Sequence, residues 1–338
     1  MDGVSGDFRP TASWEVLRLR AGMLRRLRAY FDEAGYLEVE TPLLSAGTVI
    51  DRHLDPFQTT LAFDPRQPHQ GATFYLQTSP ELCMKRLLAA GGPNMYQITR
   101  SFRNGEAGPL HNPEFTIVEW YALGHGMKEQ MAMLGDLAES ALQGTALHAQ
   151  LSWPAEPLSY ASAFEQHVGL NPHTAQVDDF QAAAQRLQVA HSLTRETDRD
   201  AWLDLLIVER VQPALGTARP VILYDFPASQ AALAQVRHTP NQPPVAERFE
   251  LYIQGVELAN GYHELLSAAV LEQRNRVQNG WRVQDGKGEL PADERLLDAM
   301  RTGLPPCSGV ALGFDRLVML AAQAKSLAEV IAFPINLA

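Results

Sequence analysis

The chain has 338 residues, of which 46% are hydrophobic and 20% charged, and its formal net charge is −11. This length supports one large domain or two small ones. The acidic balance excludes the overall positive charge of a strong nucleic-acid binder, although it is compatible with a local basic patch.

The cysteines and the start of the chain exclude further classes of protein. Cys83 and Cys307 lie far apart and neither has a CxxC partner, so neither a zinc site nor a disulfide framework is indicated. The start, MDGVSGDFRP, is polar and acidic, unlike a signal peptide. No run of about 18 apolar residues occurs, so we expect no membrane span and a cytoplasmic protein.

A long helix is predicted after a flexible N-terminus at 1–12. Ser13 can cap this helix, and Gly35 can end it. Its buried face is predicted to hold Leu17, Leu24, Leu27 and Phe31. The next segment, GYLEVETPLL, is extended and is interrupted by Pro42. The helix and this strand could belong to the hydrophobic core or form a contact between two copies of the chain.

Residues 47–71 are predicted to be irregular with short strands, and 74–78 to form a strand. Ser79, Pro80 and Glu81 then begin a helix, with a cap, a proline at the first position and an acid in the first turn. Taken alone, Glu81 is explained by its favourable interaction with the helix dipole.

The segment 96–121, YQITRSFRNGEAGPLHNPEFTIVEWY, is predicted to be a hairpin with a polar loop at 104–113. Alternation puts Phe115 and Glu119 on one face of the second strand, on the order of 13 Å apart. With Arg103, the hairpin could offer an aromatic ring, a cationic fork and a distant carboxylate to an elongated ligand with a flat ring, a phosphate and an ammonium. The alternative is an ordinary amphipathic hairpin with solvated charges.

The middle of the chain is predicted to be mostly helical. A helix over 127–146 would pack its methionines in the core. Two or three helices over 153–217, including 177–187 and 199–211, carry no chemical signature, and we interpret them as an insertion over the edge of the site. A buried strand is predicted at 220–226.

The next segment, RFELYIQGVELANGYHEL, is predicted to be a tight hairpin that turns at residues 254–255. This register sets Tyr252 opposite Glu257, with Glu250 as its diagonal neighbour. The two carboxylates would share a face, where Mg²⁺ would relieve their repulsion. The alternative is a pair of solvated acids on a sheet edge.

Two further residues of this hairpin have the wrong parity for that face. Asn260 and Glu264 reach it only if the strand kinks, and Gly261 is the candidate position for a kink or bulge. Helices are predicted over 265–279 and 292–301. The final motif, PPCSGVALGFDRLVML, gives a strand at 308–312 and a helix with Arg316 in its first turn, where the helix dipole favours anions.

In this order the elements resemble the catalytic core of the class II aminoacyl-tRNA synthetases, over essentially the whole chain. The first helix with GYLEVETPLL is similar to their dimerisation motif, FRNGEAGPLHNPEF to their second motif and SGVALGFDR to their third. Within this class the chain resembles lysyl-tRNA synthetases most, on the segments TSPELCMKRL, HNPEFTIVEWY and ELYIQGVELANGYHEL. The resemblance implies an α+β fold, with a mostly antiparallel β-sheet flanked by helices.

Two departures from lysyl-tRNA synthetases favour a related family. The core begins at about residue 13, so we expect a single catalytic domain at 13–338 without the anticodon-binding barrel, and Ala311 stands where the synthetase pattern has glycine, near the amino-acid pocket. Both features resemble the elongation factor P lysine ligase family. That family activates (R)-β-lysine as an adenylate, with ATP and Mg²⁺, and transfers it to a lysine of elongation factor P. The resemblance implies β-lysine or lysine as substrate, a homodimer and no stable tRNA binding.

The resemblance also implies roles for individual residues. The catalytic residues would be Arg103 and Arg316. The ATP-binding residues would be Arg103, Asn104, Glu106, His111, Phe115, Glu250, Glu257 and Arg316, with Mg²⁺ held by Glu250 and Glu257. Phe115 and Arg316 would enclose adenine. The amino-acid site would consist of Glu81, Arg103, Glu119, Tyr121, Asn260, Glu264 and Ala311. Within it, the substrate's side-chain ammonium would be received by Glu119, Tyr121 and Glu264, and its other amine and carboxylate by Glu81 and Asn260.

One departure concerns the adenine contact. The second motif has Glu directly after FRN, whereas this chain has Gly105 followed by Glu106. We hypothesise that Glu106 takes over the contact through the flexible glycine.

Three other functions compete with this interpretation. A tRNA-charging enzyme predicts a basic groove or an anticodon module. An ammonia-dependent asparagine synthetase needs a cationic pocket, for which Glu119 and Glu264 have the wrong sign. A non-catalytic regulatory relative would not need Arg103, Arg316 and the two candidate metal acids together.

Overall fold

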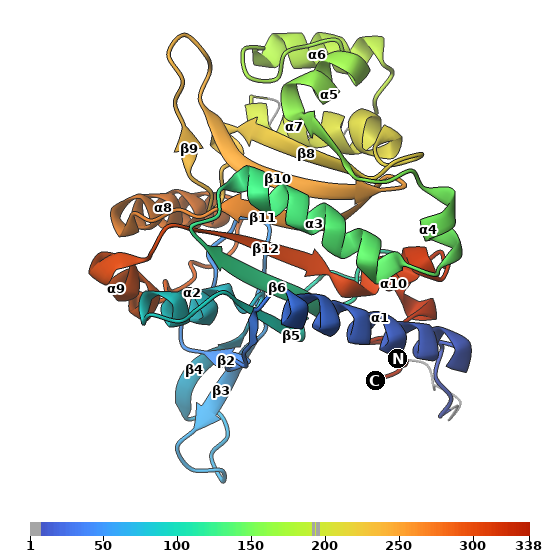
Figure 1. The fold of residues 1–338 in the computed structure, drawn as a ribbon. Helices are drawn as coiled ribbons and strands as arrows, with labels where there is room; N and C mark the ends of the chain where they lie inside the picture. The colour runs from blue at the N-terminus through green and yellow to red at the C-terminus, as the bar shows by residue number, and fades with distance from the viewer. Residues whose placement is uncertain (1–7, 191–192, 194–196) are drawn as a thin grey trace.

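The computed structural model describes residues 8–190, 193 and 197–338, and within them nine strands form one large sheet (Figure 1). They are β1 (Leu37–Glu38), β5 (Met95–Phe102), β6 (Glu114–Leu123), β7 (Glu156–Ser159), β8 (Val221–Pro227), β9 (Val236–Arg237), β10 (Val245–Ile253), β11 (Val256–His263) and β12 (Cys307–Gly313). Their order is β1-β5-β6-β12-β11-β10-β8-β7, and β9 pairs with β10. Only β1 and β7 pair in parallel within this described sheet, so the prediction of a mostly antiparallel sheet is confirmed.

Helices cover both faces of the large sheet. They are α1 (Trp14–Glu33), α2 (Glu81–Ala89), α3 (Met127–Leu142), α4 (Ala146–Gln150), α5 (Tyr160–His167), α6 (Val177–Arg186), α7 (Arg199–Leu206), α8 (Ala268–Gln284), α9 (Glu294–Gly303) and α10 (Phe314–Ala321). Alternation along β6 separates the faces. Trp120 packs in the core with Phe31 of α1 and Leu134 of α3, whereas Tyr121 packs with residues of α2, α8 and α9.

Helix α1 forms as its sequence predicts, with a shifted buried face. The Ser13 hydroxyl accepts a hydrogen bond from the backbone N–H of Val16 at 3.2 Å, and Gly35 follows the helix with φ +74°. The fully buried residues are Met23, Leu27 and Phe31, whereas Leu17 and Leu24 are only partly buried. The i, i+4, i+8 spacing of the buried three sets the face that meets the sheet.

The expected flexible segment at 1–12 falls largely outside the description, because residues 1–7 are not described. At its end, the backbone N–H of Thr11 donates to the carbonyl of Ala332 at 3.0 Å and Ala12 is buried. The chain therefore contacts the C-terminal segment before α1 begins, and the flexibility of 1–12 remains a prediction.

The helical prediction for 153–217 missed a strand. β7 joins the edge of the large sheet through parallel pairing with β8, and α5, α6 and α7 pack with β8 and β10 in a separate hydrophobic cluster. The helix predicted over 199–211 is not α-helical throughout, because α7 ends at Leu206 and the chain continues as a π-helix, Ile207–Val211. That these residues form an insertion remains a prediction.

The hairpin of β10 and β11 turns at Gln254 and Gly255, both with positive φ, and pairs Tyr252 with Glu257 as expected. The register then shifts, because Leu251 pairs with Ala259 and leaves Leu258 as a bulge. Glu250 consequently lies opposite Asn260.

The expectation that Gly261 forms the kink is wrong. A side chain at Gly261 would overlap the ring of Phe249, since a Cβ atom there would lie 2.3 Å from it. The glycine is needed for close packing of β11 on β10, whereas the bulge at Leu258 brings Asn260 and Glu257 to one face.

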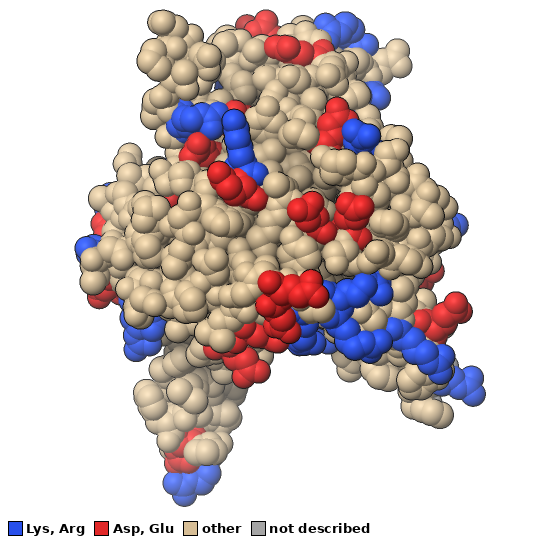
Figure 2. All heavy atoms as spheres, in the orientation of Figure 1, with Lys and Arg blue, Asp and Glu red and all other residues tan. Residues whose placement is uncertain are grey.

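A second, three-stranded sheet projects from the body of the molecule (Figure 1). It consists of β2 (Leu44–Ser45), β3 (Gln58–Ala62) and β4 (Gly71–Leu76). Figure 2 shows basic side chains gathered over α1, which carries Arg18, Arg25 and Arg28 on its exposed side, so the acidic chain does have a local basic patch.

No helix in the described ranges is both long and apolar enough to cross a membrane.

Candidate active site

A cavity of about 1280 Å³ lies on the face of the sheet covered by α2 and α8. Single-ligand pockets in proteins are usually about 300–1,000 Å³, so this space can hold two substrates. Every residue predicted for the site lines it except Asn104, whose backbone N–H donates to the carbonyl of Asp55 at 2.7 Å. The structure therefore brings together residues that the sequence separates by more than 200 positions.

One part of the cavity is formed by the hairpin of β5 and β6. The guanidinium carbon of Arg103 lies 5.1 Å from the centre of the Phe115 ring, and its Nη1 lies 3.8 Å from Glu106 Oε1. Gly105 has φ +83°, which lets the chain turn between these two residues. Glu106 thus lines the cavity beside Arg103, and its contact with adenine remains a prediction.

Arg316 is fixed at the start of α10 by three contacts. Its Nε donates to the carbonyl of Leu110 at 3.1 Å, its Nη1 to the carbonyl of Glu257 at 3.0 Å, and its Nη2 lies 2.8 Å from His111 Nε2. Burial, then the charge of Arg316, lower the pKa of His111, so neutral His111 can accept this hydrogen bond. The guanidinium is held ready for a ligand without having to reorganise.

Acidic side chains form another part of the cavity. Glu119 is 2% exposed, and its Oε1 accepts a hydrogen bond from the Tyr121 hydroxyl at 2.8 Å. Its Oε2 is buried without a hydrogen-bond partner among the described residues. Burial, followed by the charge of Glu81, raises the pKa of Glu119 to about 8, so the carboxyl is mostly protonated at neutral pH. An arriving ammonium group would supply the missing partner.

Two more carboxylates, Glu81 and Glu264, share a buried lysine. Lys85 Nζ forms an ion pair with Glu81 Oε1 and lies 2.5 Å from Glu264 Oε2. Burial raises the pKa of Glu264 to about 7 against the lowering effect of Lys85. A side chain at Gly309 would overlap Glu264 Oε1 and the Tyr121 ring, each 2.4 Å from its Cβ position. The glycine of the PPCSG segment therefore keeps room for the acids.

Ala311 lies between the two halves of the amino-acid site. Its partner on β6 is Glu119, and its partner on β11 is Asn260. Its methyl group lines the cavity. A small change in the volume of this side chain would therefore change the space available to a ligand bound next to Glu119 and Asn260.

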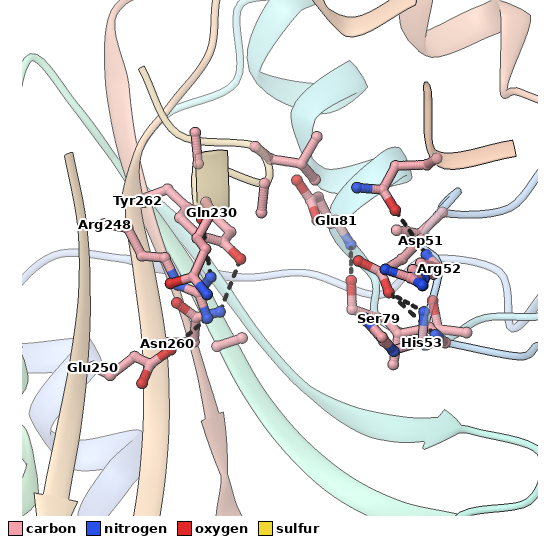
Figure 3. Close-up of a pocket in the computed structure, with 18 of the residues that line it drawn as sticks. Asp51, Arg52, His53, Ser79, Glu81, Gln230, Arg248, Glu250, Asn260 and Tyr262 are labelled. Carbon is pink, nitrogen blue, oxygen red and sulfur yellow. Dashed lines mark hydrogen bonds and ion pairs between the residues drawn. The ribbon is translucent and has the colours of Figure 1, made fainter. Parts of the chain in front are cut away.

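The wall formed by β10 and β11 holds Glu250 and Glu257, the two carboxylates expected to bind Mg²⁺. Glu250 accepts hydrogen bonds from Arg248 Nη2 and from the Tyr252 hydroxyl, the latter at 2.5 Å, and burial raises the pKa of Glu250. Figure 3 shows Arg248 and Glu250 on one side of the cavity and Glu81 with Ser79 on the other. Arg248 Nη1 also donates to the carbonyl of Gln230 at 3.0 Å.

The donor set on this wall fits Mg²⁺ in part. Glu250 and Glu257 lie on one face and repel each other, and Asn260 Oδ1 is buried without a hydrogen-bond partner in the described part of the chain. No group of three or more His, Cys, Asp or Glu side chains that could hold a metal occurs within the described ranges. Two carboxylates suit an ion that keeps waters and shares phosphate oxygens, as Mg²⁺ does.

Sequence reasoning missed Lys85 and Arg248. Both left a signal in the sequence: Lys85 follows Glu81 by four positions on a helix, and Arg248 shares the parity of Glu250 and Tyr252 on a strand. Neither signal says that the cation is buried, which the structure shows for Lys85, 3% exposed.

Comparison with known proteins agrees with this geometry. The sequence matches the family of class II tRNA synthetases (D, K and N) over residues 6–337. It is 46% identical over 329 residues to the elongation factor P–(R)-beta-lysine ligases of Salmonella dublin, Salmonella paratyphi B and Salmonella heidelberg. Each alignment covers 97% of this chain and 98% of the relative.

Proposed function

The chain belongs to the elongation factor P–(R)-β-lysine ligase family within the class II tRNA synthetases, and from this premise we propose that it activates (R)-β-lysine with ATP and transfers it to a lysine side chain of elongation factor P. The observation that carries the proposal is the cavity itself. It joins the cationic and aromatic group of Arg103, Phe115 and Arg316 to the buried acids Glu119 and Glu264.

In the first step, a carboxylate oxygen of β-lysine attacks the α-phosphorus of ATP, and pyrophosphate leaves. Arg103 would bind the α-phosphate and the attacking carboxylate, and its charge offsets the negative charge that builds up between them. Phe115 and Arg316 would hold the adenine ring, and His111 the outer phosphates. Positioning and charge stabilisation suffice here, because a carboxylate needs no general base.

The other substrate groups would be held by the acids. Glu119, Tyr121 and Glu264 would receive the distant ammonium, whereas Glu81 and Asn260 would lie nearer the other amine and the carboxylate. Glu250 and Glu257 would hold Mg²⁺, which supplies positive charge to the phosphates when bound. Ala311 would shape the space between them and favour the β-amino acid.

In the second step, the ε-amine of the protein lysine attacks the carbonyl carbon of the mixed anhydride. An amide bond forms, the bond to phosphate breaks, and AMP leaves with the electron pair while the amine loses a proton. The proposed enzyme works in the cytoplasm, where translation factors act.

We also propose a homodimer. The segment after α1 exposes Leu37, Leu43 and Leu44, between 39% and 52% accessible, which a second copy would cover.

The test incubates the protein with ATP, Mg²⁺, labelled β-lysine, elongation factor P and bulk tRNA in one mixture. AMP formation with label on elongation factor P supports the proposal, and a factor variant without its acceptor lysine should stay unlabelled. Label on tRNA in place of the factor would mean a tRNA-charging enzyme. No AMP with β-lysine would end the proposal.

A further inference from the structure

A buried lysine lies among the acids of the amino-acid pocket, and the proposed mechanism does not use it. The ammonium of Lys85 touches Glu81 on its own helix and Glu264 at the end of β11, and lies 6.0 Å from the centre of the Tyr121 ring. Both acids line the cavity with Lys85. A surface ion pair would have little effect on the site, but an ion pair this deeply buried fixes both partners.

The charges of the pocket can be counted. Glu81, Glu119 and Glu264 give three negative charges when all are ionised, and Lys85 gives one positive charge, so the sum is −3 + 1 = −2. The two ammonium groups of a diamino acid cancel this sum, while its carboxylate is matched separately by Arg103. A ligand with one ammonium leaves a buried carboxylate without compensation, which is costly in a site that excludes water.

We propose that Lys85 is a positioning residue that acts as a permanent positive charge of the pocket: it holds Glu81 and Glu264 in place and sets the pocket to accept an amino acid with two ammonium groups. The inference rests on the proposed function and adds to it a reason for choosing diamino acids. Lys85 itself touches no substrate in this account. It acts through the two carboxylates that it orients.

When the pocket is empty, the carboxyl of Glu119 is mostly protonated and therefore adds no negative charge. The charged and titratable groups around it are Glu81 and Lys85 from α2, Tyr121 from β6 and Glu264 beyond β11. His263 and Cys307 in turn interact with Glu264. The raised pKa of Glu119 means that a bound ammonium displaces a proton from it. Binding of a diammonium ligand therefore releases a proton from Glu119 and part of a proton from Glu264, whose pKa is about 7, to solvent near neutral pH.

Removing Lys85 should change this proton count. In Lys85→Met, the aliphatic stem remains but Glu81 and Glu264 lose their shared cation. The pKa of Glu264, which Lys85 lowers, should then rise, so that Glu264 keeps its proton at pH 7. A second ammonium then has to displace that proton as well. We expect β-lysine to bind about 10–100-fold more weakly at pH 7 and to release more protons than from the wild-type protein.

The experiment is calorimetric titration of β-lysine in phosphate and in Tris buffer at pH 7, which gives affinity and proton release together. Arg86→Met is the matched control, because it removes a cation of the same helix that does not line the cavity. Lys85→Arg, which keeps the charge, should restore the wild-type proton count. ATP affinity should stay unchanged in each variant, which shows that the fold is intact.

A second arm uses the wild-type protein alone, so a variant that fails to fold does not end the test. 3-Aminoheptanoate replaces the distant ammonium of β-lysine by a methyl group. It should bind at least 100-fold more weakly than β-lysine and release no proton. Equal affinity and proton release for the two ligands, or a folded Lys85→Met with wild-type values, would overturn the role of Lys85. A wild-type protein that does not bind β-lysine would instead contradict the proposed function.

Discussion

Ala311 of β12 lies directly opposite Glu119 of β6, so a methyl group stands beside the carboxylate that we assign to the substrate ammonium. The neighbouring strand places Asn260 on the other side of this methyl group. The pairing connects the substrate preference of the site to one small side chain.

The first prediction concerns this methyl group. Ala311→Gly should shift the preference from β-lysine towards α-lysine, because it opens space next to Glu119 and Asn260. A change of this size in a pocket alters the ratio of kcat/KM for two substrates by about tenfold. Adenylation kinetics with both amino acids measure the ratio. If it is the same in the variant and the wild type, Ala311 does not select the substrate.

The second prediction concerns the carboxylate of Glu119. Glu119→Gln keeps the size and the hydrogen bond with Tyr121 but removes the charge. The KM for β-lysine should rise about 10–100-fold, since a hydrogen bond between charged groups contributes about 1.5–3 kcal/mol, while the KM for ATP stays the same. The control is Glu114→Gln on the same strand, which is exposed and should have wild-type kinetics. An equal effect on both KM values would contradict the assignment.

The third prediction concerns pH and stability. The carboxyl of Glu119 ionises near 4.5 in an unfolded chain, and its pKa is about 8 in the folded protein. Between these values the folded protein keeps a proton that the unfolded chain has released. The contribution of Glu119 to the free energy of unfolding is therefore complete below pH 4.5 and is lost as the pH rises towards 8.

Urea unfolding without ligand at pH 5.5 and 7.5 measures this effect against Glu119→Gln, which cannot titrate. The wild type should lose about 1 kcal/mol per pH unit more than the variant. A loss of the same size in both proteins would show that Glu119 is ionised in the folded state.

The fourth prediction concerns the adenine contact. Glu106→Ala should raise the KM for ATP several-fold and leave the KM for β-lysine unchanged, since Glu106 lines the cavity beside Arg103. Glu114→Ala provides the control at the other end of the same loop. An unchanged KM for ATP in Glu106→Ala would show that Glu106 does not replace the missing acid.

Local patterns in the sequence predicted most of the strands and helices, whereas most of the residues that line the cavity were expected only from the resemblance to class II synthetases. The turn at Gln254 and Gly255 gave the pairing of Tyr252 with Glu257, which the structure confirms. The bulge at Leu258 was not predictable, because neither the turn nor the alternation of the strand shows where the register shifts. Strand β7 was missed because its four residues, EPLS, are too few to show a pattern, and because its pairing partner β8 lies about 60 residues further along the chain.

The buried cations show what the sequence could not predict about the site. A lysine four residues after a glutamate is usually a solvated ion pair on a helix, so nothing in the local pattern distinguishes Lys85. Its burial follows from Tyr121, Cys307 and the residues of α9, which pack around α2 from distant parts of the sequence. The charge of the pocket therefore becomes visible only in the folded chain.

The central claim is that the cavity activates an amino acid with two ammonium groups. ATP–pyrophosphate exchange with a panel of amino acids tests it most directly, because this assay reports adenylate formation without any acceptor. We predict the fastest exchange with (R)-β-lysine, slower exchange with lysine, and none above background with aspartate, norleucine or 3-aminoheptanoate. Exchange that is fastest with aspartate or with an amino acid carrying a single ammonium would contradict the account.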